Sequence, residues 1–353
     1  MERGAKLYTL DGLRGFAAIA VVAFHTPGPL QDLVPSAYLA VDLFFVLSGY
    51  VIARSYDGRI ASGLMGVGDF VRTRFIRLYP LLFIGALIAV ATKAGGIALG
   101  VADDDPERFA AQILGIFLVA PVTWAEDEFL FNLNVPVWSL FFEIVANLAF
   151  VTWFSFFARH LAMFVAFAAI ALIATVTLSG SAEIGAEWTS FAGGFARVAF
   201  SFFAGVLIFR VRRRMSVPAL PAWAYPPILI AALAADPHGF KAAYDLFCIL
   251  VVFPLMVAGA ARVEPQGALK ESYAFLGAVS YGVYVLHYPF CRAMNNLDLF
   301  TQESPLVMIA AGLALIAGVI VLAWLLDRAY DQPARRRLTR ALAPAGVLAP
   351  ERR

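Results

Sequence analysis

An arginine and a histidine share the first apolar stretch of the chain, LDGLRGFAAIAVVAFH, in which ten residues separate Arg14 from His25. A histidine ring titrates near neutral pH and can remove a proton from a hydroxyl group, whereas an arginine can bind a phosphate group through two parallel hydrogen bonds. An ionisable side chain within a membrane-spanning helix is costly and usually faces a partner or a water-filled cavity. The pair therefore marks a candidate functional site.

The composition of the chain is that of a multi-pass membrane protein. Of its 353 residues, 61% are hydrophobic and 15% are charged, and the mean hydropathy is +0.78, whereas a typical soluble domain has about 25% charged residues. The two cysteines, Cys248 and Cys291, lie in apolar segments, which predicts free thiols rather than a disulfide framework. The first apolar segment lacks a clear small-residue cleavage site, so we expect no cleaved signal peptide.

Ten stretches approach the ~20 apolar residues that a helix needs to cross a bilayer. The sequence therefore predicts an all-α membrane bundle with about ten transmembrane helices. An even number of crossings places both chain ends on one side, and the loops on that side are much richer in arginine and lysine, which makes it cytoplasmic. The predicted spans are residues 13–30, 37–56, 78–98, 137–157, 160–179, 192–210, 222–236, 241–261, 274–294 and 304–327.

One apolar stretch, residues 109–122, is too short to cross the membrane. We predict a re-entrant or interfacial segment before residue 137, because irregular backbone at membrane depth must be buried in protein or line a cavity. No internal repeat is apparent in the sequence. We therefore treat residues 1–331 as a single transmembrane domain and residues 332–353 as a basic cytoplasmic tail able to contact anionic lipids.

Four titratable side chains are predicted to share one level in the outer half of the membrane. At ~1.5 Å per residue, His25 lies about 16 Å deeper than Arg14, and Asp42 and Glu143 lie roughly 7 and 10 Å below the outer surface. His287, on the ninth span, also lies toward the outside. These side chains could form one site, but a carboxylate that pairs with a histidine as a purely structural couple is an equal alternative.

Three arginines gather in the cytoplasmic segment VRTRFIRLYP. Arg72, Arg74 and Arg77 are expected near one face of a helix that ends before Pro80. Such a cluster beside a membrane binds either anionic lipid headgroups or the phosphates of a cytosolic cofactor.

Other polar positions have alternative interpretations. The run Ser48, Gly49 and Tyr50 is either a small-residue contact between helices or the lining of a ligand tunnel. The remaining histidines, His160 and His238, are expected in solvated turns, away from any site.

Five segments occur in a distinctive order along the chain: LDGLRGFAAIAVVAFH, AVDLFFVLSGY, RFIRLYP, VPVWSLFFE and SYGVYVLHYP. Together they resemble the membrane acyltransferase-3 family, and the resemblance covers nearly the whole chain. Each segment alone is a weak signal, whereas the ordered set is specific. Asp331, in YDQPARR, stands where the resemblance leads us to expect a glutamate.

The resemblance implies an integral membrane O-acyltransferase that moves an acyl group, often acetyl, from cytosolic acyl-CoA to a hydroxyl, usually of a cell-envelope glycan. Arg14 and His25 are then the catalytic motif. The expected partners are acyl-CoA, a glycan acceptor and membrane lipids, with no metal and no nucleic acid, and a homo-oligomer is left open. The expected location is the bacterial inner membrane, and no fused esterase-like domain is expected.

The proposed chemistry centres on His25 as the general base that deprotonates the acceptor hydroxyl while the thioester is attacked. Asp42 or Glu143 is expected to orient its imidazole. An alternative is that His25 first carries the acyl group itself. The expected acyl-CoA contacts are Arg14, Arg72, Arg74, Arg77, Ser48 and Tyr50, and the expected acceptor contacts are Trp138, Ser139, Tyr281 and His287.

Two rival functions use the same residues differently. A proton-coupled transporter or flippase of a glycan or lipid-linked substrate would use the buried charges as a proton relay. A lipid-binding scaffold would use the segment from Arg72 to Arg77 and would leave His25 without a role.

Overall fold

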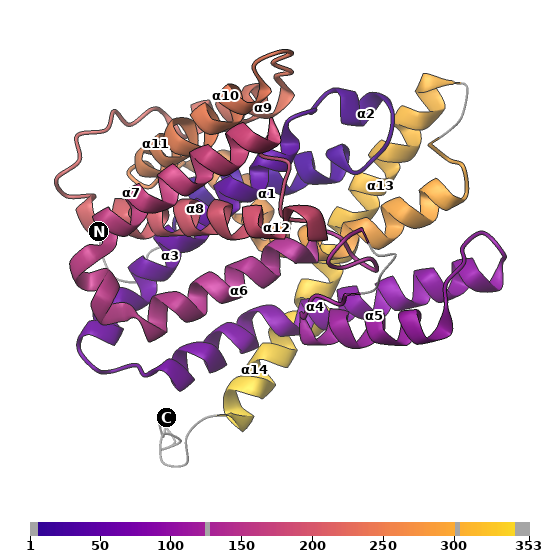
Figure 1. Cartoon of the computed structure of the whole chain (residues 1–353), viewed down its shortest axis with the longest axis horizontal. Helices are drawn as coiled ribbons and strands as arrows, with labels where there is room; N and C mark the ends of the chain where they lie inside the picture. Colours follow the sequence, from indigo (N-terminus) through magenta and orange to yellow (C-terminus); the bar gives the residue numbers. More distant parts are fainter. Residues whose placement is uncertain (1–5, 124–127, 301–303, 343–353) are drawn as a thin grey trace.

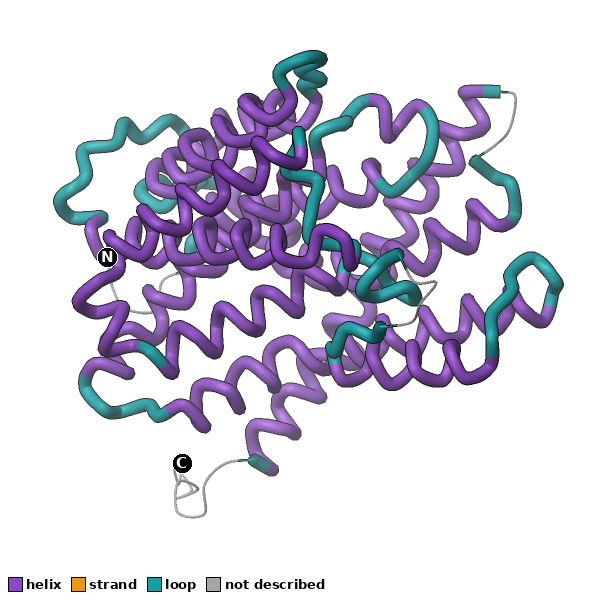
Figure 2. Tube along the Cα trace, viewed as in Figure 1, coloured by secondary structure: helices purple, strands orange, loops and turns teal. Residues whose placement is uncertain are grey.

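The computed structural model describes residues 6–123, 128–300 and 304–342, and within these ranges every regular element is a helix (Figures 1 and 2). Helices far apart in sequence pack along each other: α1 (Tyr8–Phe24) lies against α12 (Gly267–Asn296), and α3 (Ala40–Ala61) lies against α8 (Phe191–Val211). The other described α-helices are α2 (Pro29–Asp32), α4 (Val67–Ala98), α5 (Pro106–Leu118), α6 (Val137–Thr152), α7 (Phe154–Ser179), α9 (Tyr225–Ala234), α10 (Lys241–Phe247), α11 (Phe253–Ala260), α13 (Pro305–Leu326) and α14 (Gln332–Ala341).

Seven of the described helices are long and apolar enough to cross a membrane, which confirms the all-helical class and supports a multi-pass membrane protein. Each predicted span overlaps a helix, but two of the apolar helices, Val137–Thr152 and Ala222–Ala234, fall short of a full crossing length. The count of ten crossings is therefore not confirmed. The cytoplasmic placement of both chain ends stays a prediction. The seven are Ala37–Ala61, Val67–Ala98, Phe154–Ser179, Trp188–Val211, Lys241–Ala260, Gly267–Asn296 and Pro305–Ala341.

Helix α1 ends at Phe24, well before the predicted end at residue 30, and His25 caps it. Pro27 and Pro29 explain the early end, because a proline disfavours helical backbone in the residue before it and has no N–H to donate. Gly28 between them has φ of +93°, which glycine adopts readily. His25 therefore stands at the exit of the helix, beside a turn.

Helix α4 continues through Pro80, where the sequence predicted its end. Proline removes one backbone hydrogen bond, and long membrane helices tolerate this loss because neighbouring groups re-satisfy the freed carbonyl. One rigid helix of 32 residues therefore carries both the arginine cluster and the apolar segment after it.

Two glycines bring α3 and α8 together. A Cβ atom at Gly49 would overlap the carbonyl oxygen of Phe202, and one at Gly205 would overlap the carbonyl oxygen of Val46. Close backbone approach at small residues is typical of packed membrane helices. Of the two interpretations offered for the run Ser48, Gly49 and Tyr50, the contact between helices is the one that applies to Gly49.

Residues 128–136 form an irregular, largely buried segment between α5 and α6. Helix α5 begins at a side-chain cap, since Asp105 Oδ1 accepts the backbone N–H groups of Glu107 and Arg108 at 2.9 and 3.0 Å. Farther along, Asn134 Nδ2 donates to the carbonyl oxygen of Val285 at 2.9 Å, which ties the segment to α12. Its depth in a membrane stays a prediction.

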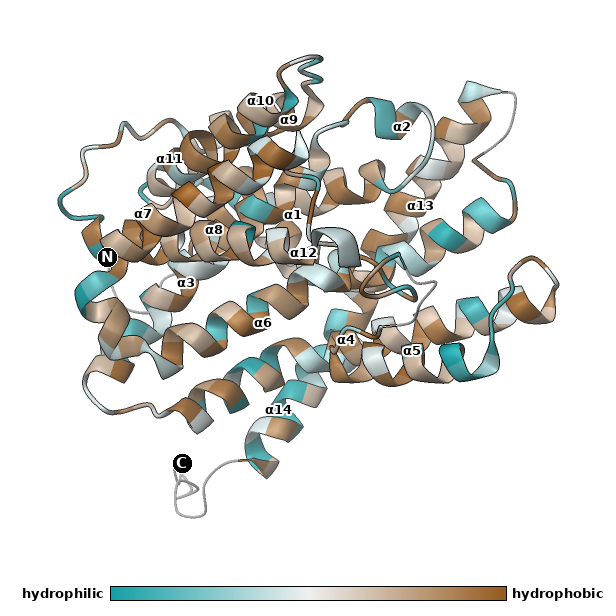
Figure 3. Ribbon diagram, in the orientation of Figure 1, coloured by the Kyte–Doolittle hydropathy of each residue, from teal (hydrophilic) through white to brown (hydrophobic). Residues whose placement is uncertain are grey.

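The chain after α13 continues as a helix through a π-helical stretch, Asp327–Asp331, into α14. The predicted domain boundary at residue 331 therefore falls inside a helix, and the rest of the predicted tail, residues 343–353, lies outside the described residues. Asp331 is buried and pairs with Arg335. Figure 3 shows hydrophobic residues along most helices and hydrophilic residues in connecting loops and on α14.

Candidate active site

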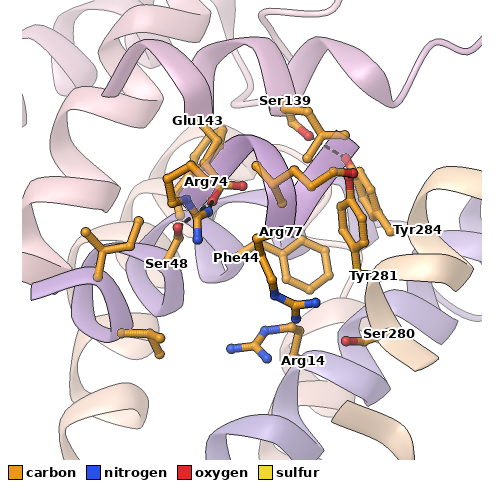
Figure 4. A pocket seen from close by; sticks show the side chains of 15 residues that line it. Arg14, Phe44, Ser48, Arg74, Arg77, Ser139, Glu143, Ser280, Tyr281 and Tyr284 are labelled. Atoms are coloured by element: carbon orange, nitrogen blue, oxygen red, sulfur yellow. Dashed lines mark hydrogen bonds and ion pairs between the residues drawn. The ribbon is translucent and has the colours of Figure 1, made fainter. Parts of the chain in front are cut away.

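Two cavities contain most of the predicted site residues, and Tyr284 of α12 lines both. The first, which we call the arginine cavity, has a volume of about 170 Å³ and lies between α1, α3, α4, α6 and α12 (Figure 4). The second, the histidine cavity, has a volume of about 220 Å³. The lining residues discussed below are Arg14, Ser48, Arg74, Arg77, Ser139, Glu143 and Tyr281 in the first, and His25, Trp138, Glu183, Glu187, Arg197 and Tyr288 in the second.

Glu143 anchors one wall of the arginine cavity. Its Oε1 atom lies 3.0 Å from Arg74 Nη2 and accepts a hydrogen bond of 2.5 Å from Ser48 Oγ. The paired side chains are 19% and 16% exposed for Arg74 and Glu143. This ion pair is therefore fixed on three helices but remains accessible from the cavity.

The opposite wall carries two arginines whose charge is less completely balanced. Arg14 Nη1 lies 3.0 Å from Asp11 Oδ1 on the same helix. Arg77 is exposed and forms no ion pair or hydrogen bond with any other residue in the described part of the chain. Figure 4 shows the Arg14 and Arg77 guanidinium groups close together. Two neighbouring positive charges repel each other, and a bound anion would relieve that repulsion.

The ring of His25 contacts the ring of His287, and their hydrogen bonds fix which nitrogens carry protons. His287 Nδ1 lies 2.8 and 3.1 Å from the carbonyl oxygens of Tyr284 and Val283. Because carbonyl oxygens only accept, this Nδ1 is protonated, and Nε2 of the neutral ring has a lone pair. His25 Nδ1 lies 2.8 Å from the Val21 carbonyl oxygen and 3.3 Å from that His287 Nε2. Both are acceptors, so Nδ1 of His25 is protonated and its Nε2 is the free base.

Aromatic side chains enclose the two histidines. His287 is fully buried, and the ring of Tyr288 meets the ring of His25 edge-on at a centroid distance of 5.4 Å. Trp138 lines the same cavity, where the Arg197 guanidinium lies 5.2 Å from the centroid of its ring. The histidine cavity therefore offers aromatic faces around a neutral base.

Tyr284 separates the two cavities. Its hydroxyl lies 2.6 Å from Ser139 Oγ and 3.1 Å from the carbonyl oxygen of Pro136, and Ser139 Oγ also lies 3.1 Å from that carbonyl. Two hydroxyl protons and one carbonyl acceptor can all be satisfied within this triangle. Tyr284 lines both cavities, so the two cavities are adjacent at its side chain.

The structure corrects the expected partner of His25. Asp42 is fully buried, and its hydrogen bonds in the described structure run to α8 instead. Arg197 Nη2 and Nε donate to Asp42 Oδ2 at 2.6 and 3.1 Å, and Ser201 Oγ donates to Oδ1 at 3.1 Å. Such a paired, hydrogen-bonded charge is a structural bridge between α3 and α8. A backbone carbonyl and a second histidine orient His25, and no carboxylate among the described residues does.

Glu143 also lies away from His25, in the arginine cavity. The prediction that His25, Asp42, Glu143 and His287 form one site is therefore wrong: the two histidines meet, and each carboxylate has its own arginine. Depth along separate helices placed these groups at similar levels but could not place them side by side.

The predicted donor contacts divide between different surfaces. Arg14, Ser48, Arg74 and Arg77 line the arginine cavity, as one cluster from three helices. Arg72 lines neither cavity, because its guanidinium donates to the Leu342 carbonyl oxygen at 2.7 Å and pairs with Asp69 at 2.7 Å. Tyr50 lines a separate cavity.

The predicted acceptor contacts divide in the same way. Trp138 lies in the histidine cavity, and His287 contacts His25. Ser139 and Tyr281 line the arginine cavity, and the Tyr281 hydroxyl donates to the Leu78 carbonyl oxygen at 2.7 Å. His160 and His238 are both exposed, as expected, but His160 lies within helix α7 and not in the predicted turn. Both cysteines are free and buried, as predicted.

Sequence reasoning missed two residues that organise the site. Arg197 is an arginine within the predicted span 192–210, and the rule that singled out Arg14 would also have singled it out. Tyr284 had no such signal, because tyrosines are common in the same segment and only its position between cavities distinguishes it.

Comparison with known proteins places these observations in a family. A model described as an acyltransferase domain, Acyl_transf_3, matches residues 7–328. The chain is 39% identical over 154 residues to "Protein 2 in picA locus" of Rhizobium radiobacter, covering 41% of this chain and 80% of that protein. It is 26% identical over 373 aligned positions to "Acyltransferase MdmB" of Streptomyces mycarofaciens, covering 96% of this chain and 94% of that protein.

A third relative is longer than this chain. "Putative O-acetyltransferase SACOL0978" of Staphylococcus aureus (strain COL) is 28% identical over 145 residues, which cover 38% of this chain and 22% of that protein. No solved protein structure matches this chain.

Proposed function

This chain belongs to the acyltransferase domain family Acyl_transf_3, and from that premise we propose that it is a membrane O-acyltransferase that moves an acyl group from acyl-CoA to a hydroxyl of a cell-envelope or secreted glycan. Acetyl is the proposed acyl group, in line with the relative named an O-acetyltransferase. The seven apolar helices support a multi-pass membrane protein, for which we propose the bacterial inner membrane.

We assign the donor to the arginine cavity. Acyl-CoA carries several phosphate groups, and arginine binds phosphate through a planar pair of donors. Arg77 has no protein partner in the described chain and stands beside Arg14, so both can turn toward an anion. Arg74 is held by Glu143 and Ser48, which suits it to position the donor rather than to supply an unpaired charge.

We assign proton transfer to His25. Its free Nε2 accepts the proton of the acceptor hydroxyl as the hydroxyl oxygen attacks the thioester carbonyl carbon. The carbon–sulfur bond then breaks, the CoA sulfur leaves with the electron pair, and the proton on Nε2 passes to that sulfur. The products are the acyl ester and CoA with a free thiol, and His25 returns to its starting form.

His287 acts on this step through His25. Its Nε2 lone pair and the Val21 carbonyl oxygen both accept from Nδ1–H of His25. These contacts keep the proton off Nε2 before the reaction and stabilise the ring when it becomes positively charged. His287 is therefore a positioning residue in this scheme, in the place where a carboxylate was expected.

We assign the acceptor to the histidine cavity. Trp138 and Tyr288 offer aromatic faces for a sugar ring, and Glu183 and Glu187 supply carboxylate oxygens that can accept from sugar hydroxyls. The thioester would reach this cavity by passing Tyr284, which lines both cavities.

The observation that carries the proposal is the free Nε2 of His25, in a cavity that shares Tyr284 with the cavity of Arg14 and Arg77. The test is the release of CoA thiol by the purified protein with acetyl-CoA and an extract of envelope glycans, followed by mass spectrometry of the glycans. His25→Ala should lower turnover by about 10²- to 10⁴-fold while the protein stays folded. Arg72→Gln, on the same face of the membrane but outside both cavities, is the matched control.

Two results would redirect the proposal. Movement of a substrate along an ion gradient without consumption of acyl-CoA would support a transporter and contradict the enzyme. Label from radioactive acetyl-CoA that stays on the protein before acceptor is added, and is absent from the His25→Ala variant, would replace direct transfer with an acyl-histidine intermediate.

A further inference from the structure

A third cavity, of about 200 Å³, lies between α3, α8, α11 and the loop that follows α8. We call it the basic cavity. It shares no lining residue with the arginine cavity or the histidine cavity. The loop after α8 forms the large loop at the left of Figure 1. The residues that define the basic cavity here are Tyr50, Ile208, Arg212, Arg213, Ala258 and Arg262.

Two of its three arginines are held in place by backbone carbonyl oxygens. Arg262 Nη1 donates to the carbonyl oxygens of Met215 and Val217, both at 3.1 Å. Arg212 donates to the carbonyl oxygen of Phe209, and its guanidinium lies 3.7 Å from the centroid of the Phe209 ring. Neither contact neutralises a charge, so these guanidinium groups are positioned and remain positive.

No carboxylate lines the basic cavity among the described residues. Asp57, which pairs with Arg210 at 2.6 Å, and Glu264, which accepts the backbone N–H of Tyr8 at 2.9 Å, lie outside this lining. Arg213 is exposed and has no ion pair within the described part of the chain. The cavity wall therefore carries uncompensated positive charge.

Tyr50 adds a further donor. Its side chain is only 4% exposed, and its ring packs edge-on against Phe209 at a centroid distance of 5.6 Å. The Tyr50 hydroxyl nevertheless has no hydrogen-bond partner in the described parts of the chain. Because Tyr50 lines the basic cavity, this hydroxyl can donate to a ligand bound there. A ligand that accepts hydrogen bonds and carries negative charge would satisfy the hydroxyl and the arginines together.

We propose that the basic cavity is a second anion site that binds a phosphate group, distinct from the donor site. The favoured source is the headgroup of an anionic phospholipid. Ile208 and Ala258 add apolar lining, and the continuous helix Lys241–Ala260, which carries Ala258, exposes Phe247, Val251 and Leu255 at intervals of four residues. These apolar side chains provide a surface for acyl chains beside the cavity, which free phosphate would not need.

The test uses the full-length protein in neutral detergent, with phosphatidylglycerol, phosphatidylcholine, inorganic phosphate and CoA as separate probes. Native mass spectrometry measures bound lipid, and the thermal unfolding midpoint reports binding of each probe. The informative variants are Arg213→Gln, which removes a side chain without protein partners, and Tyr50→Phe, which removes only the hydroxyl. Arg214→Gln is the matched control, because Arg214 is the next residue, is exposed and does not line the cavity.

We expect phosphatidylglycerol to bind and to raise the unfolding midpoint more than phosphatidylcholine does. Arg213→Gln should weaken this binding about fivefold, and Tyr50→Phe should weaken it by a smaller factor, while Arg214→Gln should leave it unchanged. The same pattern with inorganic phosphate alone would keep the phosphate site and identify free phosphate as its source. Equal binding by all variants, or a parallel loss of CoA binding in Arg213→Gln, would overturn the proposal. None of these readouts depends on acyl transfer. The experiment can therefore overturn the lipid-site proposal without testing the proposed function, and the reverse also holds.

Discussion

Asp42 and Glu143 both pair with arginines, but the two pairs lie in different surroundings. The Asp42–Arg197 pair is 0% and 1% exposed and is enclosed between α3 and α8. The Glu143–Arg74 pair is 16% and 19% exposed and faces a cavity. The first pair is closed by its own hydrogen bonds, although Arg197 borders the histidine cavity, whereas the second pair is itself part of the wall of the arginine cavity. The Asp42 carboxylate is therefore part of a structural bridge between two helices, whereas the Glu143 carboxylate is part of a cavity wall.

The difference teaches where the chemistry can reside. A fully buried ion pair satisfies itself and leaves nothing for a substrate. The histidine pair is different, because its internal hydrogen bonds leave one nitrogen, His25 Nε2, without a protein partner. We therefore place the proposed chemistry at this unsatisfied nitrogen and not at the paired charges.

The largest expected effect is on stability at the enclosed pair. Asp42→Ala should lower the free energy of unfolding by about 3–5 kcal/mol, because it leaves the Arg197 charge buried without a partner. Glu143→Ala, at the cavity-facing pair, should cost less, because the Arg74 guanidinium left behind can be solvated from the cavity. Denaturant unfolding in detergent measures both. Equal losses for the two variants would contradict the contrast between the pairs.

The next effect concerns the arginine cavity and donor binding. Arg77→Gln should raise the KM for acyl-CoA by about 10- to 100-fold, as expected for the loss of a hydrogen bond between charged groups, with a smaller change in kcat. Steady-state kinetics with varied acetyl-CoA measures this. Arg72→Gln should leave the KM within about twofold, because Arg72 pairs with Asp69 at the surface. A larger effect at Arg72 would move the donor site out of the cavity.

A smaller effect is expected at the histidine pair. His287→Ala should lower kcat about tenfold and leave the KM for acyl-CoA unchanged, because His25 loses one of two acceptors that hold its Nδ1–H and keeps the Val21 carbonyl. Separate measurement of kcat and KM tests this. A rise in KM alone would make His287 a substrate contact rather than a positioning residue.

The smallest effect is expected at Tyr284, the residue that lines both the arginine cavity and the histidine cavity. Tyr284→Phe keeps the ring and removes the hydroxyl, so kcat should change by less than about fivefold. Ser139→Ala removes the same hydrogen bond from the other side and should give a similar change. Rapid-mixing kinetics of CoA release would detect it. Opposite effects of the two substitutions would show that the bond itself does not control passage between the cavities.

Much of the architecture followed from local sequence. Each of the ten predicted apolar spans overlaps a helix of the structure, since a chain in lipid must satisfy its backbone hydrogen bonds within each segment. The predicted end of the first span at residue 30 was wrong, although Pro27 and Pro29 flank Gly28 shortly after His25 and indicate the earlier end at Phe24. The continuation of α4 through Pro80 was not predictable, because a proline alone does not say whether neighbouring helices support the bend.

Which residues share a cavity was less predictable than which residue types the site contains. Ser48, Gly49 and Tyr50 are consecutive, yet they face the arginine cavity, helix α8 and the basic cavity respectively. Successive residues on a helix point about 100° apart, so adjacency in sequence separates them in space. The sequence offered two alternative roles for the run as a whole, whereas the packing gives its three residues three different surroundings.

For Arg14 and His25, the sequence by itself determined the types, the spacing and the membrane setting, because these depend on one helix and its solvent. It could not determine their partners. Only the tertiary structure decided that Asp42 belongs to Arg197, that Glu143 belongs to Arg74, and that His25 meets His287. The physical reason is that depth along a helix fixes one coordinate of a side chain, while contact requires all three, and helix packing supplies the other two.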